Sequence, residues 1–284
     1  MATSYHIHTR WSDGRGEFED YVAAAIAAGL EEIGFSDHWA LTASGDTPWW
    51  SMAPDGLDDY LDAIGDVISA LKYRNAGEGG GLIVRAGIEA DFVPERIADI
   101  RAALDGRPFD YVIGSIHFVG DFVVDASPSP WEAFTAEEID RLFISYYRLV
   151  RQMAETQLFD IVGHFDVLRK FGFAASCDLA TVISEALDSI KEAGTALELN
   201  TSGRHTPSGQ AYPEPWILRE CLRRSIPVLI TADAHESGSI RRDFDTAETM
   251  LAEIGFRQTV RFEKRRAIPE ELGTRQFPNS SKCV

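Results

Sequence analysis

Cysteine is scarce in this sequence, and its few positions form no pattern. The 284 residues contain three cysteines, at positions 177, 221 and 283. This odd, widely spaced set excludes a disulfide framework, and none of the spacings fits a cysteine zinc site. We therefore expect reduced thiols, as in a cytoplasmic protein.

Long apolar runs are also missing. No stretch of about 18 consecutive apolar residues occurs, which excludes a membrane-spanning helix. The chain goes almost at once into the segment His6-Ile7-His8, without the charged and apolar regions of a secretory leader. The sequence thus predicts a soluble, cytoplasmic protein with no membrane partner.

Basic residues are few relative to acidic ones. Lys and Arg number 27 against 45 Asp and Glu, which gives a formal net charge of −18. An averaged field of this sign repels nucleic-acid phosphates. The only dense cationic cluster, residues 264–266 (KRR), is short and set among acidic neighbours. We expect no nucleic-acid partner, although a local positive pocket is compatible with this charge.

The sequence does have an ordinary globular balance, with 45% apolar and 25% charged residues. It predicts a single domain over residues 1–284, with residues 255–284 as a C-terminal extension whose structure the pattern does not define. Short apolar runs alternate with longer amphipathic ones, which is typical of an α/β protein with a parallel sheet. The oligomeric state is left open.

Seven apolar runs predict strands, and helical periodicity predicts helices between them. Strands are expected at residues 5–8, 32–36, 82–90, 111–117, 160–164, 196–200 and 227–231. Helices are expected at residues 18–28, 57–73, 95–104, 136–158, 178–193, 216–224 and 243–254. Loops are expected at residues 75–81, 125–131 and 203–212 and at the C-terminal end. This order builds either an open doubly wound sheet or a closed barrel, and the pattern alone does not separate them.

The histidines are the most informative residues. There are seven, at positions 6, 8, 38, 117, 164, 205 and 235, and six of them end or immediately follow a predicted strand. In both layouts, side chains at the carboxyl ends of strands converge where ligands bind. Each of these histidines alone could be a hydrogen-bonded core residue, and an HxH pair alone is often incidental.

Glu89 is harder to explain as an isolated polar residue. An ionised carboxylate near the end of the apolar run 82–92 needs a cationic partner, and Arg85 is the only basic residue in that run. One multinuclear metal site explains Glu89 and the histidines together. The alternative is that several polar residues occur at the same edge of the sheet, each for a separate structural reason.

The order of these motifs is similar to that of the PHP (polymerase and histidinol phosphatase) family. The motifs are HIH at 6–8, SDG at 12–14, GFSDH at 34–38, GIE at 87–89, GSIH at 114–117, GHFD at 163–166, ELNTSG at 198–203 and TADAH at 231–235. They span about residues 5–240. The GFSDH, GSIH and ELNTSG segments most resemble bacterial L-histidinol-phosphate phosphatases, whereas relatives directed at nucleic acid usually have LTDH in place of the GFSDH ending.

The resemblance implies a distorted seven-stranded (β/α)7 barrel with the metal site at the carboxyl ends of its strands. It also implies three divalent metal ions, and mixed imidazole and carboxylate ligands suit Zn, Mn or Fe. The implied ligands of the first ion are His6, His8, Glu89 and Asp233. Glu89 would bridge to a second ion held by His117 and His164, and the third would be held by Asp13, His38 and His235.

The family chemistry implies roles for further residues. A metal-bound hydroxide would attack the phosphorus, with Glu89 and Asp233 as catalytic carboxylates. Family members carry a basic residue in the loop after Gly203, so Arg204 or His205 would contact the phosphate, and His205 could also protonate the leaving alkoxide. Arg169 and Ser115 are further candidate substrate contacts.

Neighbouring residues have less specific expectations. Asp37 is expected to orient a metal ligand from outside the cluster. Lys170 and Asp125 are interpreted mainly as solvated loop charges, although either could contact the substrate. The tryptophans at 39, 49, 50 and 131 are placed in loops at the same mouth, where one could cover an imidazole ring but each is more typical of packing.

Three functions compete at this point. The first is hydrolysis of L-histidinol phosphate to L-histidinol and phosphate in histidine biosynthesis. The second is hydrolysis of another small phosphate ester, such as a nucleotide or sugar phosphate. The third is a catalytically idle metal-binding scaffold, against which the complete ligand set argues. All three functions imply bound divalent metal. The first two imply a small substrate, and the third implies none.

Overall fold

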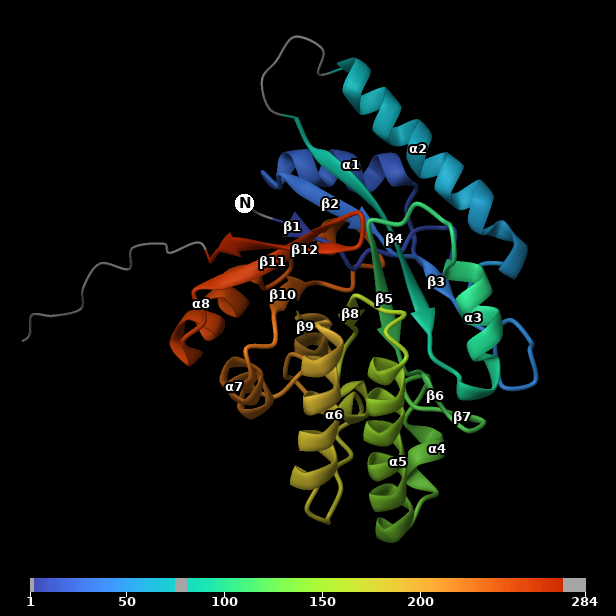
Figure 1. The fold of residues 1–284 in the computed structure, drawn as a ribbon, viewed down its shortest axis with the longest axis vertical. Helices are drawn as coiled ribbons and strands as arrows, with labels where there is room; N and C mark the ends of the chain where they lie inside the picture. Colours follow the sequence, from blue (N-terminus) through green and yellow to red (C-terminus); the bar gives the residue numbers. More distant parts are fainter. Residues whose placement is uncertain (1–2, 75–80, 273–284) are drawn as a thin grey trace, which may run out of the picture.

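A computed structural model describes residues 3–74 and 81–272 of the protein. Seven parallel strands form one sheet in the order β1-β2-β4-β5-β8-β9-β10, and helices pack around it (Figure 1). The strands are β1 (Thr3–Ser4), β2 (Glu32–Phe35), β4 (Ile83–Asp91), β5 (Tyr111–Ser115), β8 (Ile161–Val162), β9 (Ala196–Asn200) and β10 (Val228–Thr231).

The two ends of this sheet meet just beyond β1 and β10. Ile7 pairs with Ala234 in a parallel bridge, in which the amide of His8 donates to the carbonyl of Ala234 at 2.9 Å and the amide of Ala234 donates to the carbonyl of His6 at 2.9 Å. These bonds close the sheet into a nearly complete barrel. The predicted (β/α)7 barrel is confirmed, and the open doubly wound sheet is excluded.

The predicted first strand needs a correction. Regular pairing with β2 ends at Ser4, and in the segment 5–8 only Ile7 makes a bridge. Ile7 still accepts from the amide of Ser36, just after β2, at 2.9 Å, while on its other side it bridges to Ala234 after β10, so the segment continues between the two strands without regular ladder pairing. The other six predicted strands occur where expected, although several are shorter, and β3 (His38–Trp39) adds a short pairing to β4.

The predicted helices all occur, with boundaries that differ by a few residues at most. They are α1 (Phe18–Ala27), α2 (Leu57–Arg74), α3 (Ile97–Leu104), α5 (Ala136–Glu155), α6 (Ala180–Ala193), α7 (Pro215–Arg224) and α8 (Phe244–Ile254). Their ends follow local rules: Thr135 and Glu138 form a capping box at the start of α5, and Gly194 ends α6 with a φ of 72°.

Several short elements lie in segments that were predicted as loops or assigned no structure. The helix α4 (Ser129–Glu132) and the strands β6 (Phe118–Val119) and β7 (Phe122–Val123) follow β5. Single 3-10 turns occur at Pro54–Gly56, Pro94–Arg96, Val167–Arg169, Ser202–His205 and Ser237–Ser239. The predicted loop at 75–81 lies almost wholly outside the described residues.

A C-terminal hairpin closes the amino end of the barrel. It consists of β11 (Gln258–Glu263) and β12 (Arg266–Glu271), for which the sequence had defined no structure. Val260 and Phe262 pack in one cluster with Tyr5 and Tyr111 inside the barrel, and the amide of Phe262 donates to the Tyr5 hydroxyl at 3.1 Å. The barrel is therefore filled at this end, and ligands can enter only at the carboxyl end of the strands.

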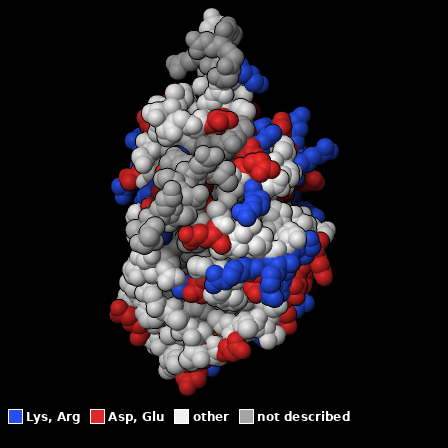
Figure 2. Space-filling view, turned by 90° about the vertical axis from the view of Figure 1, so that its left-hand side faces the viewer, with Lys and Arg blue, Asp and Glu red and all other residues white. Residues whose placement is uncertain are grey.

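The surface and the helices agree with the charge and hydropathy of the sequence. Lys and Arg lie intermingled with Asp and Glu on the face shown in Figure 2. None of the helices in the described part of the chain is both long and apolar enough to cross a bilayer. Cys177 and Cys221 are free thiols, and Cys283 lies outside the described residues.

Candidate metal centre

Nine side chains that the sequence suggested as metal ligands converge at the carboxyl end of the barrel. They fall into overlapping groups whose nitrogen and oxygen atoms lie within 4.8 Å of one another. Each comes from the end of a strand or the loop after it, because the strand ends of a closed barrel surround one point. The nine are His6, His8, Asp13, His38, Glu89, His117, His164, Asp233 and His235.

Glu89 lies between two sets of imidazoles. Its Oε1 is 3.0 Å from His164 Nε2 and 4.0 Å from His117 Nε2, and its Oε2 is 3.2 Å from His6 Nε2 and 2.8 Å from His38 Nδ1. Glu89 is fully buried on β4. Its two oxygens thus contact different imidazoles, so one carboxylate could serve as a ligand to two cations.

The HxH pair faces Asp233 across the closure of the barrel. His8 Nε2 lies 3.2 Å and His6 Nε2 lies 3.7 Å from Asp233 Oδ1. Both imidazoles are fully buried, while Ile7 between them makes the bridge to Ala234. The closure that turns the sheet into a barrel therefore also places these three ligand candidates together.

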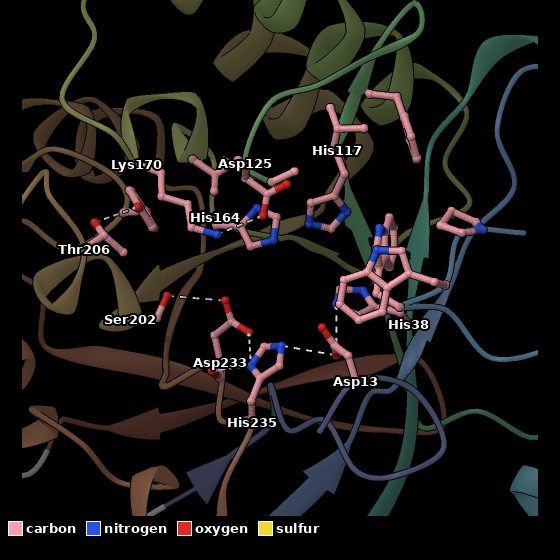
Figure 3. Close-up of a pocket in the computed structure, with 18 of the residues that line it drawn as sticks. Asp13, His38, His117, Asp125, His164, Lys170, Ser202, Thr206, Asp233 and His235 are labelled. Carbon is pink, nitrogen blue, oxygen red and sulfur yellow. Dashed lines mark hydrogen bonds and ion pairs between the residues drawn. The ribbon is translucent and has the colours of Figure 1, made fainter. Parts of the chain in front are cut away.

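A third group lies nearer the mouth. Asp13 Oδ1 is 3.3 Å from His235 Nε2 and 3.8 Å from His38 Nε2. The ring of His8 lies 4.2 Å from the ring of His38 and 4.3 Å from that of His235. Figure 3 shows Asp13 between His38 and His235, on the wall opposite Lys170 and His164.

The donor atoms fit divalent metal ions. Seven buried atoms of the nine side chains have no hydrogen-bond partner, and five of them lie within ion-pair distance of other members of the cluster: His6 Nε2, His8 Nε2, His38 Nδ1, Asp13 Oδ1 and Glu89 Oε2. Such orphaned atoms are rare in folded proteins, because each loses its hydration without compensation. All five point into the cluster, where a cation would satisfy them. Imidazole nitrogens together with carboxylates suit zinc, manganese or iron.

The electrostatics of the cluster also favour ligation. Burial disfavours an ionised Glu89, but the neighbouring His38 and His6 outweigh burial and hold the pKa of Glu89 well below its usual range. Burial, together with His38 and His235, lowers the pKa of His8 to about 3. His8 is therefore a neutral imidazole at pH 7, with a lone pair available to a metal.

Two buried carboxylates that the sequence analysis did not select hold the ligand imidazoles. Glu198 Oε2 lies 2.8 Å from His6 Nδ1, and the other oxygen of Glu198 accepts from the amide of His164 at 2.5 Å. Asp91 Oδ1 lies 2.6 Å from His117 Nδ1. A carboxylate on the far nitrogen fixes the ring and its tautomer, as is typical around metal sites.

A signal for these two residues was present in the sequence. Asp91 is two residues after Glu89 and therefore faces the same side of β4. Glu198 is a carboxylate inside the otherwise apolar strand β9, the same anomaly that identified Glu89.

Asp37 acts on a loop instead of on a ligand imidazole. Its carboxylate accepts from the Thr9 amide at 2.6 Å, the Thr9 hydroxyl at 2.9 Å and the Ser12 hydroxyl at 2.7 Å. These bonds fix the turn that carries Asp13. Gly14 completes the turn, because a side-chain carbon there would lie 2.0 Å from the carbonyl oxygen of His8.

A large cavity of about 480 Å³ opens from the cluster to the surface. Its lining changes along its length. Near the cluster it is lined by ligand candidates and by Lys170, whose Nζ is 3.2 Å from Asp125 Oδ2. Farther out, the lining includes the apolar side chains of Pro48, Trp49 and Val123. Lys170 and Asp125 are thus part of this wall, where the sequence analysis had favoured solvated loop charges.

The tryptophans at 39, 49, 50 and 131 lie in three different environments. The ring of Trp50 stands edge-on to His38 at 4.7 Å and to His117 at 5.3 Å, at the inner part of the large cavity. Trp49 lines the same cavity and is 89% exposed. Trp39 and Trp131 are buried in the core, so the expected position at the mouth is wrong for Trp131.

The predicted substrate contacts do not line the large cavity. Ser115 is fully buried, and its hydroxyl donates to Glu89 Oε1 at 2.5 Å. Arg169 forms ion pairs with Asp166 at 3.2 Å and Glu214 at 3.0 Å. These two side chains are occupied by structural partners.

Arg204 and His205 share one partner. Arg204 Nε lies 3.5 Å and His205 Nε2 lies 2.7 Å from Asp243 Oδ2. His205 lines a smaller cavity beside the metal centre, and Lys170 is the basic residue that reaches both cavities. Lys170 is therefore a cationic side chain that could bind an anion in the large cavity, whereas the predicted Arg204, His205 and Arg169 do not line it.

Comparison with known proteins identifies the family. The PHP domain matches residues 4–202, which is more than half of the chain. The chain belongs to the PHP-domain family. This result confirms the family resemblance that the spacing of the motifs had indicated.

Two relatives show how far the similarity extends. A probable histidinol-phosphatase from Deinococcus radiodurans is 34% identical over 265 residues, which cover 93% of this chain and 97% of the relative. A histidinol-phosphatase from Bacillus subtilis is 29% identical over 83% of this chain and 94% of the relative.

A solved structure has the same fold. The histidinol phosphate phosphatase from Lactococcus lactis superposes with a TM-score of 0.76 at 23% sequence identity, covering 94% of this chain and 98% of that one. It was crystallised with zinc, L-histidinol and phosphate. The similarity confirms the barrel of this PHP-domain protein.

We predict that the gently purified PHP-domain protein contains about three transition-metal ions per chain, because nine donors are available. Chelation should lower the melting temperature by at least about 5 °C, since ions that bind only the folded state stabilise it by mass action. Elemental analysis and thermal unfolding measure the two effects. Less than one bound equivalent in active protein, or no thermal shift on stripping, would contradict the prediction.

Glu89→Gln should lower turnover by more than about a hundredfold, beyond the ten- to hundredfold typical for loss of a partner that merely orients a ligand. The substitution removes one of the two anionic oxygens that face the separate imidazole groups. Asp37→Asn is the matched control, because the Asp37 side chain holds the Asp13 turn, whereas its bond to the Glu89 amide is made by the backbone carbonyl, which the substitution leaves in place. Wild-type turnover of Glu89→Gln at full metal occupancy would show that Glu89 does not bridge two ions.

Proposed function

We propose that this protein is a metal-dependent phosphomonoesterase that hydrolyses L-histidinol phosphate to L-histidinol and phosphate. The observation that carries the proposal is the single cavity that joins a cluster of nine ligand candidates to an apolar, partly aromatic wall. The relatives support the same substrate, because they are named as a probable histidinol-phosphatase and a histidinol-phosphatase. The similarity to this chain covers nearly their whole length. The reaction would be a step of histidine biosynthesis in the cytoplasm.

The metal end of the cavity suits a phosphate group. We assign three divalent ions to the nine ligand candidates, with Glu89 between two of them. When bound, such ions supply Lewis acidity toward the phosphoryl oxygens and ionise a water at neutral pH. Three ions carry a charge of about +6 against three ligand carboxylates, so this end is positive within a protein of net charge −18.

The protein side chains orient the group that binds there. Glu198 and Asp91 hold the rings of His6 and His117 in one orientation, so that their ligating nitrogens face inward. Lys170 extends over the opening beside His164, where its ammonium group can contact a phosphoryl oxygen (Figure 3). Asp125 holds Lys170 in this position through the 3.2 Å ion pair.

The outer part of the cavity suits the rest of L-histidinol phosphate. An imidazole ring is flat and can stack on an aromatic side chain; Trp49 supplies such a surface in the outer part of the cavity, and Trp50 supplies another nearer the metal centre. The ammonium group of the substrate needs an anion, and the Asp125 carboxylate is only about a quarter exposed in the same wall, with a side-chain exposure of 23%. A sugar phosphate offers neither the ring nor the ammonium group.

Purified protein loaded with zinc or manganese should be assayed on a panel of phosphate monoesters. We expect kcat/KM for L-histidinol phosphate to exceed that for ribose 5-phosphate or a nucleoside monophosphate by at least about a hundredfold, because unpaired buried polar groups penalise the wrong substrate. Faster hydrolysis of another ester would assign a different substrate. No hydrolysis at full metal occupancy would indicate an idle scaffold.

The geometry also predicts which cation contacts the phosphate. Lys170→Ala should raise KM by about tenfold, the effect of losing one charge-assisted hydrogen bond. Arg204→Ala should raise KM less, because Asp243 already pairs with this guanidinium and its side chain lies outside the large cavity. Steady-state kinetics of the two variants decides between them. The opposite order would restore the assignment that the family resemblance implied for Arg204.

A further inference from the structure

A second cavity of about 330 Å³ lies beside the metal centre. This side cavity shares five lining residues with the large cavity: Lys170, Ser202, Thr206, Asp233 and His235. The two cavities therefore meet at the metal centre and leave it in different directions. Nothing in the proposed function uses the side cavity.

The lining of the side cavity differs from that of the large cavity. Its lining includes three Lys and Arg side chains, Arg15, Lys170 and Arg242, together with two histidines and the carboxylates of Asp233 and Glu236, and it lacks the tryptophans of the large cavity. Arg15 pairs with Glu236 at 3.8 Å, and Lys170 pairs with Asp125 at 3.2 Å. Two of the three positive charges are thus already balanced.

Arg242 is the exception. Its Nε is buried and has no hydrogen-bond partner, and the described residues provide no ion-pair partner for its guanidinium. Burial of a donor without an acceptor costs free energy, which an anion in the side cavity would recover.

The backbone holds Arg242 in place. Its carbonyl accepts from the hydroxyl of Thr201 at 2.8 Å, and its amide donates to the carbonyl of Ser239 at 3.0 Å. Thr201 is fully buried directly after β9. These bonds fix the backbone from which the Arg242 side chain reaches the side cavity.

Asp243, the next residue in the chain, pairs with two other basic side chains that could bind an anion. Asp243 binds both Arg204 and His205, the basic residues of the loop after Gly203. Its own φ of 61° is in the left-handed region, where an aspartate is tolerated. The carboxylate therefore faces those two side chains, while Arg242, adjacent in the chain, keeps its charge available to the side cavity.

We propose that the side cavity is an anion subsite, separate from the metal centre, in which Arg242 binds inorganic phosphate as it leaves. This inference rests on the proposed phosphatase function. The organic product would leave through the large cavity, whose outer walls are apolar. Phosphate would leave through the side cavity, in which the planar guanidinium can donate two parallel hydrogen bonds to its oxygens.

The proposal is tested by isothermal titration of inorganic phosphate into the metal-loaded protein and by inhibition of ester hydrolysis by phosphate. Arg242→Gln should weaken phosphate binding by about tenfold and relieve inhibition by the same factor. Arg242→Lys, which keeps the charge, should lose less. Arg241→Gln is the matched control, because Arg241 pairs with Asp245 at 2.7 Å and does not line the side cavity.

The readouts separate this subsite from the metal centre. Metal content and melting temperature of each variant must match those of the wild type. For Arg242→Gln, kcat/KM of the ester should fall by a smaller factor than the affinity for phosphate. Equal factors would assign Arg242 to the phosphoryl group of the substrate, and unchanged phosphate affinity would exclude a contact; either result overturns the proposal.

The calorimetric experiment needs no organic substrate. If L-histidinol phosphate is not hydrolysed, the proposed substrate fails while the phosphate titration still reports on Arg242. Conversely, normal hydrolysis with unchanged phosphate affinity in Arg242→Gln leaves the proposed function intact and removes the side cavity as a phosphate site.

Discussion

A carboxylate that is fully buried and ionised needs positive charge beside it, and most of this site follows from that requirement at Glu89. Imidazoles from four different strand ends lie within 4.0 Å of its two oxygens. Only a closed barrel brings so many strand ends to one point. The bridge between Ile7 and Ala234 therefore positions the ligand candidates that flank these two residues, His6, His8 and Asp233.

The two ends of the barrel have different tasks. At the amino end, aromatic residues and the β11–β12 hairpin fill the interior, and Tyr111 bonds to the carbonyls of Tyr5 and Phe35 at 2.5 and 3.1 Å. At the carboxyl end, polar side chains replace this packing, and buried atoms are left without partners. The polar cluster at the carboxyl end contributes little to the stability of the fold on its own. The apolar packing at the amino end therefore keeps the strands, and with them the cluster, in place.

Charge is distributed unevenly within this acidic protein. Outside the centre, carboxylates neutralise most of the basic side chains near the site: Asp125 pairs with Lys170, and Asp243 pairs with Arg204 and His205. Positive charge is thus available where metal ions bind and at Arg242. Such an arrangement attracts a phosphate group to the centre without making the whole surface attractive to polyanions.

The sequence by itself located most of the barrel strands, the seven long helices and the family, because apolar periodicity and short motifs are local, but it defined no structure for the β11–β12 hairpin. The HxH pair, Glu89 and the histidines after β5 and β8 could be identified as candidates since each is a polar residue at the end of an apolar run. Which basic side chains face the cavities could not be predicted. Arg204, His205 and Lys170 each have a carboxylate beside them and Arg242 has none among the described residues, and those carboxylates come from segments that meet only in the folded barrel.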